Sequence, residues 1–121
     1  MAASSASLMR GLEMLRDGQF DDSLDFLLQA LVESPTNTEV HVFLAYAYSK
    51  LGDQEKAIEI LEQAVSISPQ SAKIHYNLGV VYQKSGNLTQ AKDQYSHALN
   101  VDPNYEAAKK ALASVSEGAS G

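Results

Sequence analysis

The chain has 121 residues, a formal net charge of −6, and no Cys or Trp. Its length allows one small domain, the lack of Cys excludes disulfides and thiolate chemistry, and its acidic balance argues against nucleic-acid binding, which depends on clustered Lys and Arg. No apolar run approaches the ~20 residues of a membrane-spanning helix, and residues 1–15 lack the basic-then-apolar order of a secretory signal. We therefore expect a cytoplasmic protein without membrane insertion.

A fixed step of 34 residues separates the prolines from one another, and also three of the glycines. These residues are Pro35, Pro69 and Pro103, and Gly18, Gly52 and Gly86. Such a period predicts stacked helix-turn-helix units, in which glycine ends the first helix and proline follows the second. We expect repeats at about 4–37, 38–71 and 72–105, and a final helix at about 106–117. This gives an all-α chain of seven helices, a single domain over 4–117 and a disordered tail at 118–121.

The first repeat keeps only part of the pattern. Gly11, Gly18, Leu27, Ala30 and Pro35 match the later repeats, whereas Ser7, Arg10, Met14 and Ser23 depart from them. Terminal repeats of a stacked array are often atypical. No polar helix precedes this repeat, whose first helix carries Leu8, Met9, Leu12 and Leu15, so this edge is a candidate for self-association.

The second and third repeats carry the same residue types at the same spacing. The second has His41, Leu44, Ala45, Tyr48, Gly52, Ala57, Leu61, Ala64 and Pro69; the third has His75, Leu78, Gly79, Tyr82, Gly86, Ala91, Tyr95, Ala98 and Pro103. The third resembles the tetratricopeptide repeat at every marked position but one, where histidine replaces the usual tryptophan. The resemblance covers nearly the whole chain. It implies a right-handed superhelical solenoid with a concave groove that receives segments of partner proteins.

Packing and capping expectations follow from the spacing. Small residues at Gly11, Ala45 and Gly79 are expected to face the small set Ser23, Ala57 and Ala91, so that paired helices approach closely. Asp53 and Asn87 are expected to cap the second helices of their repeats, with Gln90 completing a capping box beside Asn87. Asn37 and Ser71 should cap the first helices. The final helix continues through Leu112 and Ala113 and then turns polar, as a solvating cap does.

The resemblance also implies a set of groove residues on the first helix of each repeat. They are Leu8, Leu12 and Arg16 in the first repeat, Val42, Tyr46 and Lys50 in the second, and Lys73, Tyr76, Val80 and Lys84 in the third. The apolar members exceed what a helical hairpin needs for its core, which favours a protein or peptide partner. The alternative is that each packs against a neighbouring helix.

The basic residues Arg16, Lys50 and Lys84 recur at the 34-residue step. They would line one edge of the groove and could hold a carboxylate of a ligand. The alternative is that each complements the dipole at the end of its helix, which contributes about 0.3–1 kcal/mol. The sequence leaves both open.

The family's carboxylate clamp for chaperone tails is missing its donors here. The resemblance places Leu8 and Leu12 where the clamp has Lys and Asn, Phe43 where it has Asn, and Asn77 where it has Arg; only Lys73 agrees. We therefore expect a chain that is not a clamp-type cochaperone.

Catalytic and metal chemistry find no support in the sequence. His41 and His75 occupy equivalent core positions in adjacent repeats, too far apart to share one ion, and each is expected to fill part of the space of a tryptophan. We expect no cofactor and no enzymatic activity. The sequence favours a protein-interaction module that binds a partner segment in its groove; the alternative is a self-associating assembly unit, and so a homo-oligomer.

Overall fold

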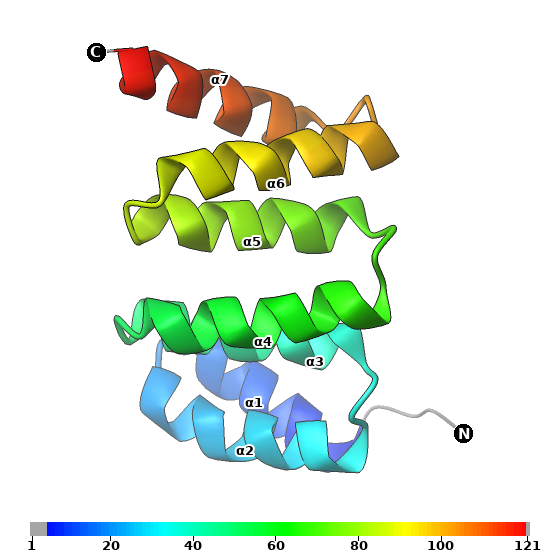
Figure 1. Ribbon diagram of the computed structural model, residues 1–121. Helices are drawn as coiled ribbons and strands as arrows, with labels where there is room; N and C mark the ends of the chain where they lie inside the picture. The colour runs from blue at the N-terminus through cyan, green and yellow to red at the C-terminus, as the bar shows by residue number, and fades with distance from the viewer. Residues whose placement is uncertain (1–4, 121) are drawn as a thin grey trace. The chain divides into compact units, whose positions relative to one another are not determined.

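The computed structural model describes residues 5–120, with side chains described through residue 116, and its helices form two compact units. The first unit, which ends at Ile67, contains α1 (Ala6–Arg16), α2 (Phe20–Glu33), α3 (Thr38–Lys50) and α4 (Gln54–Ile67). The second, which begins at Ser68, contains α5 (Ala72–Lys84), α6 (Leu88–Val101) and α7 (Glu106–Ser120). Within the second unit α6 lies between α5 and α7 (Figure 1). Every element of residues 5–120 is helical, which confirms the all-α class and the seven expected helices.

Glycines end the first helix of each repeat, as the sequence predicts. Gly18, Gly52 and Gly86 have φ of 78°, 89° and 88°, a left-handed conformation that side chains disfavour. The amide after each glycine donates back across the last turn, as Gln19 N does to Met14 O at 2.8 Å. This bond satisfies a carbonyl that the helix end would otherwise leave unpaired.

Helix starts confirm most of the expected caps. Asn37 accepts a hydrogen bond from Glu39 N at 3.0 Å, Ser71 from Ile74 N at 3.3 Å, and Asp53 from Lys56 N at 3.1 Å. The expected cap at Asn87 is wrong, because its side chain makes no capping hydrogen bond. Its ψ of 74° falls short of the extended backbone seen at Asn37 and Ser71, which directs an N-cap side chain toward the first amides of a helix.

The core pairs small residues with large ones. A Cβ added to Gly11 would lie 2.7 Å from Leu27 Cδ2, and one added to Gly79 would lie 2.6 Å from Tyr95 Cε1. The atoms nearest to these glycines thus belong to Leu27 and Tyr95 rather than to the small residues Ser23 and Ala91. The missing side chain makes room for a large residue on the opposite helix, and both Leu27 and Tyr95 are fully buried as a result.

The last helix extends beyond its expected end. We expected α7 to stop near residue 117 and residues 118–121 to form a disordered tail, but α7 continues to Ser120. Gly118 does not end the helix, because glycine, unlike proline, retains its N–H and accepts helical φ. Residue 121 lies outside the described residues.

Candidate peptide-binding surface

The first helix of each repeat carries three of the expected groove residues at i, i+4 and i+8, which places them on one side of the helix. The sets are Leu8, Leu12 and Arg16 on α1, Val42, Tyr46 and Lys50 on α3, and Tyr76, Val80 and Lys84 on α5. Each set runs from two apolar or aromatic side chains to a cation in the last turn. The cations are exposed, the apolar residues are half-buried except for buried Leu8 and exposed Tyr46, and Lys73 is exposed at the start of α5.

Tyr46 is the aromatic residue that this side of α3 offers to solvent. It is 46% exposed, yet its ring is held in place by two neighbours. Phe20, the first residue of α2, meets the ring edge-on with centroids 6.0 Å apart, and Lys50 Nζ lies 5.6 Å from the ring centroid. A cation over a tyrosine ring contributes about 0.5–1 kcal/mol at an exposed site. Tyr46 is therefore an oriented apolar surface with a positive charge beside it.

Arg16 is the basic residue at the end of α1, and it remains available to a ligand. Its Nε lies 3.6 Å from Asp17 Oδ1, but both side chains are more than half exposed. Exposed pairs of this kind contribute about 0–1 kcal/mol, so a ligand carboxylate competes easily. Arg16, Lys50 and Lys84 all occupy the last turn of a helix, so both interpretations of the basic row fit the geometry.

Tyr76 on α5 has different surroundings. Its ring lies 5.8 Å from that of Tyr95 on α6 and 5.5 Å from that of Tyr105, between α6 and α7. Tyr95 donates its hydroxyl to Gln83 Oε1 at 2.7 Å. Burial, with a smaller effect of Tyr76, raises the pKa of Tyr95 to about 12. Tyr76 is thus part of the packing of the second unit, and its half-buried face is what remains for a partner.

Tyr105 is a neighbour of the expected site that the sequence did not indicate. It lies 29 positions beyond Tyr76, and no helical spacing links the two. Burial, followed by Tyr76 and Asp102, raises the pKa of Tyr105 above its usual value. A tyrosine immediately before the last helix carries no recognisable pattern, so only the fold brings it to Tyr76.

The positions of the missing carboxylate clamp are apolar in the first unit. Leu8 is buried, and Leu12 and Phe43 are half-buried. In the second unit Lys73 is exposed, but Asn77 donates from Nδ2 to the carbonyl of Lys73 at 3.0 Å. A partner would therefore meet apolar side chains on the first unit where a clamp offers donors.

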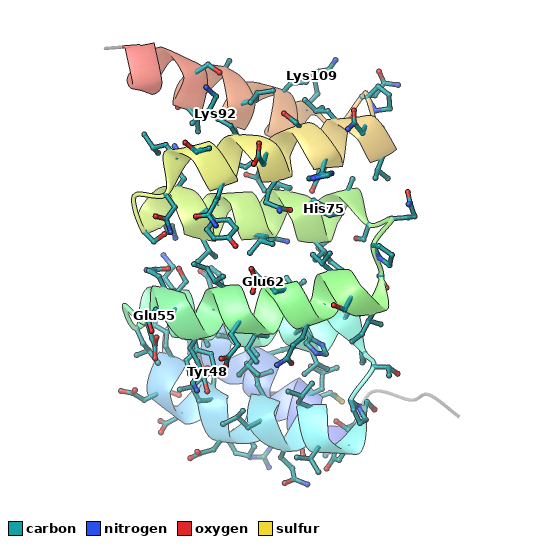
Figure 2. All side chains as sticks on the ribbon, viewed as in Figure 1. Tyr48, Glu55, Glu62, His75, Lys92 and Lys109 are labelled. Carbon is teal, nitrogen blue, oxygen red and sulfur yellow. The ribbon has the colours of Figure 1, made fainter. Side chains whose placement is uncertain are left out.

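The buried histidines serve packing and local hydrogen bonding. His41 Nδ1 lies 3.0 Å from Asn37 O, and His75 Nε2 lies 2.8 Å from Pro69 O. His75, labelled in Figure 2, also bonds Gln94 through Nδ1 at 2.8 Å and stacks on His97 with centroids 5.3 Å apart. The described part of the chain holds no group of three or more metal-ligating residues. Nor does any of its helices combine the length and apolarity that a bilayer crossing requires.

Known protein families match this pattern over most of the chain. Models described as tetratricopeptide repeats match residues 14–64 and 72–105, and one described as TPR repeat matches residues 45–86. The chain belongs to the tetratricopeptide repeat family, whose domains are in general protein-interaction modules. No curated protein sequence matches the chain.

Solved structures resemble the chain in fold. The Sgt2 tetratricopeptide domain from Aspergillus fumigatus is 24% identical, with a TM-score of 0.90, and the match covers 99% of this chain and 81% of that one. The first such domain of Spaghetti (RPAP3), bound to the HSP90 peptide SRMEEVD, is 22% identical with a TM-score of 0.88 and covers 98% and 97%. MamA is 24% identical with a TM-score of 0.86, covering 94% and 67%. These identities establish the tetratricopeptide solenoid fold alone.

Proposed function

We propose that this chain is a non-enzymatic protein-interaction module that binds a peptide segment of a partner protein along the first helices of its repeats. The observation that carries the proposal is the exposed ring of Tyr46, held between Phe20 and Lys50. Aromatic anchors that lose little freedom on binding contribute strongly to interfaces. In this proposal residues 4–117 work as one domain, in the cytoplasm and without a cofactor.

Each first helix contributes differently to the proposed surface. Tyr46 is the anchor on α3, flanked by half-buried Val42, and Leu12 supplies apolar surface on α1, where Leu8 is buried. Tyr76 and Val80 offer half-buried apolar surface on α5, with Lys73 at its start. Arg16, Lys50 and Lys84 orient acidic groups of the ligand, so the preferred peptide combines an apolar side chain with nearby carboxylates.

The ligand in this proposal is not a chaperone tail. The Spaghetti domain binds an acidic HSP90 peptide, and the second domain of human RPAP3 binds an HSP70 peptide, SGPTIEEVD. Here Leu8, Leu12 and Phe43 offer no hydrogen-bond donor at the clamp positions. A terminal carboxylate bound beside these residues would lose its hydrogen bonds to water without gaining a donor, which weakens binding. Apolar contacts must therefore supply the affinity.

Selection from a displayed library of random peptides tests the proposal. Enriched peptides are synthesised and titrated calorimetrically against the wild type and Tyr46→Ala, and we expect about a tenfold or greater loss of affinity in the variant. Leu51→Ala is the matched control, because Leu51 is 40% exposed at the end of α3 but outside the proposed surface. If the selected peptides bind a folded Tyr46→Ala protein as tightly as the wild type, the proposed anchor is wrong.

A second candidate function is self-association through α1. Met9 is 55% exposed on this terminal helix, which favours a contact there. Other positions of α1 oppose it, because they are smaller or charged where α3 is apolar. Exposed Ala6 and Glu13 stand on α1 where α3 has the buried residues Val40 and Ala47. Sedimentation velocity over a wide concentration range distinguishes the two, since a concentration-dependent dimer abolished by Met9→Glu supports self-association and a strict monomer rejects it.

A further inference from the structure

The exposed side of α2 carries apolar side chains that are not buried against the other helices. Val32 is 73% exposed and Leu28 is 39% exposed, and half-buried Leu24 lies one turn before Leu28. The three residues follow one another at four-residue steps and so form a stripe along one side of the helix. We refer to Leu24, Leu28 and Val32 as the α2 stripe.

The other second helices of the repeats lack this stripe. At the equivalent positions α4 has Ile58, Glu62 and Ser66, and α6 has Lys92, Ser96 and Asn100. The fold thus forms with polar residues where α2 has Leu28 and Val32. Since exposed Leu and Val contribute nothing to solubility and little to stability, the α2 stripe requires an explanation other than the repeat fold.

The charged residues of α2 itself all have one sign. Asp21, Asp22, Asp25 and Glu33 are exposed on α2, which contains no Lys or Arg. The helix dipole accounts for Asp21 and Asp22 in the first turn but opposes Glu33, the last residue of the helix. Ser7 Oγ and Gln29 Nε2 donate to Glu33 Oε2 at 3.2 and 3.3 Å, so this unfavourably placed carboxylate is held in position. The bond from Gln29, with others from Ser5 and Ser7, lowers the pKa of Glu33.

We propose that the exposed side of α2 is a second interaction surface, which binds a basic amphipathic helix of a partner protein. The apolar side of the partner helix covers the α2 stripe, and its Lys or Arg residues pair with Asp25 and Glu33. A second copy of this chain fits poorly, because pairing two α2 helices would bring acidic residues against acidic residues in a chain of net charge −6. Leu28, Val32, Asp25 and Glu33 all lie beyond Leu24 on α2, whereas Phe20, one turn before Leu24, meets the ring of Tyr46. The proposal therefore does not rest on the peptide-binding function.

Fluorescence anisotropy with two labelled synthetic peptides tests the proposal. One is an amphipathic helix of about 18 residues with a leucine stripe flanked by lysines, and the other replaces every lysine with glutamate. We expect the wild-type chain to bind the lysine peptide only, about tenfold more weakly at high salt than at low salt because the flanking charges are exposed. Equal binding of both peptides, or none of either, would overturn the proposal.

Variants distinguish binding at the α2 surface from a general attraction of the basic peptide to an acidic chain. Leu28→Glu/Val32→Ser gives α2 the residues that α4 carries, so the fold should tolerate it, and Asp25→Asn/Glu33→Gln removes the paired charges. Each is expected to weaken binding of the lysine peptide by about fivefold or more. Glu55→Gln/Asp93→Asn removes as many exposed charges elsewhere and should change affinity by less than about twofold.

Two results from these variants would contradict the assignment. The first is an unchanged affinity in both α2 variants, with circular dichroism showing that they are folded. The second is concentration-dependent dimerisation of the wild type that Leu28→Glu/Val32→Ser abolishes, since this would make a second copy the occupant. The variant Tyr46→Ala should change binding of the lysine peptide by less than about twofold, because Tyr46 lies on α3 and contacts α2 at Phe20, one turn before the α2 stripe.

Discussion

Tyr46 and Tyr76 were expected in the same role, and the two units give them different ones. Tyr46 on α3 is 46% exposed and touches one ring and one cation, whereas Tyr76 on α5 is half-buried against the rings of Tyr95 and Tyr105. The repeat register places both on the same side of their helices. They occupy positions one turn apart in the repeat, since the 34-residue step pairs Tyr46 with Val80 and Tyr76 with Val42. The second helix of the repeat also differs, because α6 carries the buried Tyr95 where α4 carries Leu61. An aromatic residue on this side of a first helix is thus exposed in one unit and mainly part of the packing in the other.

Removal of the Tyr95 side chain should lower the free energy of unfolding more than removal of Tyr46 or Tyr76. It is 1% exposed and fills the space beside Gly79, so Tyr95→Ala should lower the free energy of unfolding by about 4 kcal/mol. Tyr95→Phe retains the ring and loses the hydrogen bond to Gln83, at a cost of about 1 kcal/mol. Urea unfolding followed by circular dichroism measures both. Equal losses would mean that the hydroxyl, not the ring, supports the second unit.

The difference between Tyr46 and Tyr76 can be measured as stability. Tyr76→Ala removes contacts to two rings and should destabilise the chain by about 2 kcal/mol, whereas Tyr46→Ala should cost less than about 1 kcal/mol. Hydrogen exchange of the α5–α7 and α3 amides locates each loss. The comparison fails if Tyr46→Ala is the more destabilising of the two.

The glycines opposite the large residues extend the comparison between the units. Gly79→Ala forces a methyl group against the Tyr95 ring and should cost about 1–2 kcal/mol, even after the gain in helix propensity. Gly11→Ala meets Cγ and Cδ2 of Leu27, an aliphatic side chain that can rotate, so its cost should be smaller. Thermal unfolding of the two variants tests this order, which is wrong if Gly11→Ala is less stable than Gly79→Ala.

Alkaline pH should weaken the second unit through Tyr95. Unfolded tyrosine ionises near pH ~10, whereas the pKa of Tyr95 in the folded chain is about 12. Folding therefore favours the protonated form, so this contribution is fully present below pH ~10 and is lost as the pH rises through the folded value. Urea midpoints across this range should fall for the wild type and fall less for Tyr95→Phe. Tyr46→Phe is the control and should retain the wild-type slope.

Much of the fold was predictable because the repeat constrains it locally. Left-handed glycines at 18, 52 and 86 and caps at Asn37, Ser71 and Asp53 depend on a few neighbouring residues, which the sequence displays directly. The cap at Asn87 failed because it depends on one backbone angle. The pairing of Gly79 with Tyr95 was missed because spacing fixes which side of a helix a residue occupies, but not which residue opposite it comes closest.

The sequence predicted which side of each helix the candidate site residues occupy, but not which of them are exposed. The expected groove set placed Leu8, Tyr46 and Tyr76 on the same side of their helices, although burial separates them into a buried, an exposed and a half-buried side chain. The contact between Phe20 and Tyr46 joins two repeats and has no counterpart in the spacing. Exposure depends on the identities of residues on other helices, and a periodic pattern on one helix does not contain them.

The central claim is that the side of α3 around Tyr46 binds a peptide. Its most direct test is the change in backbone amide chemical shifts when a peptide selected from the displayed library is added to isotope-labelled chain. The account predicts that the largest changes fall at Val42, Tyr46 and Lys50 and disappear in Tyr46→Ala. Changes confined to α2 or α4, with those α3 amides unmoved, would contradict it.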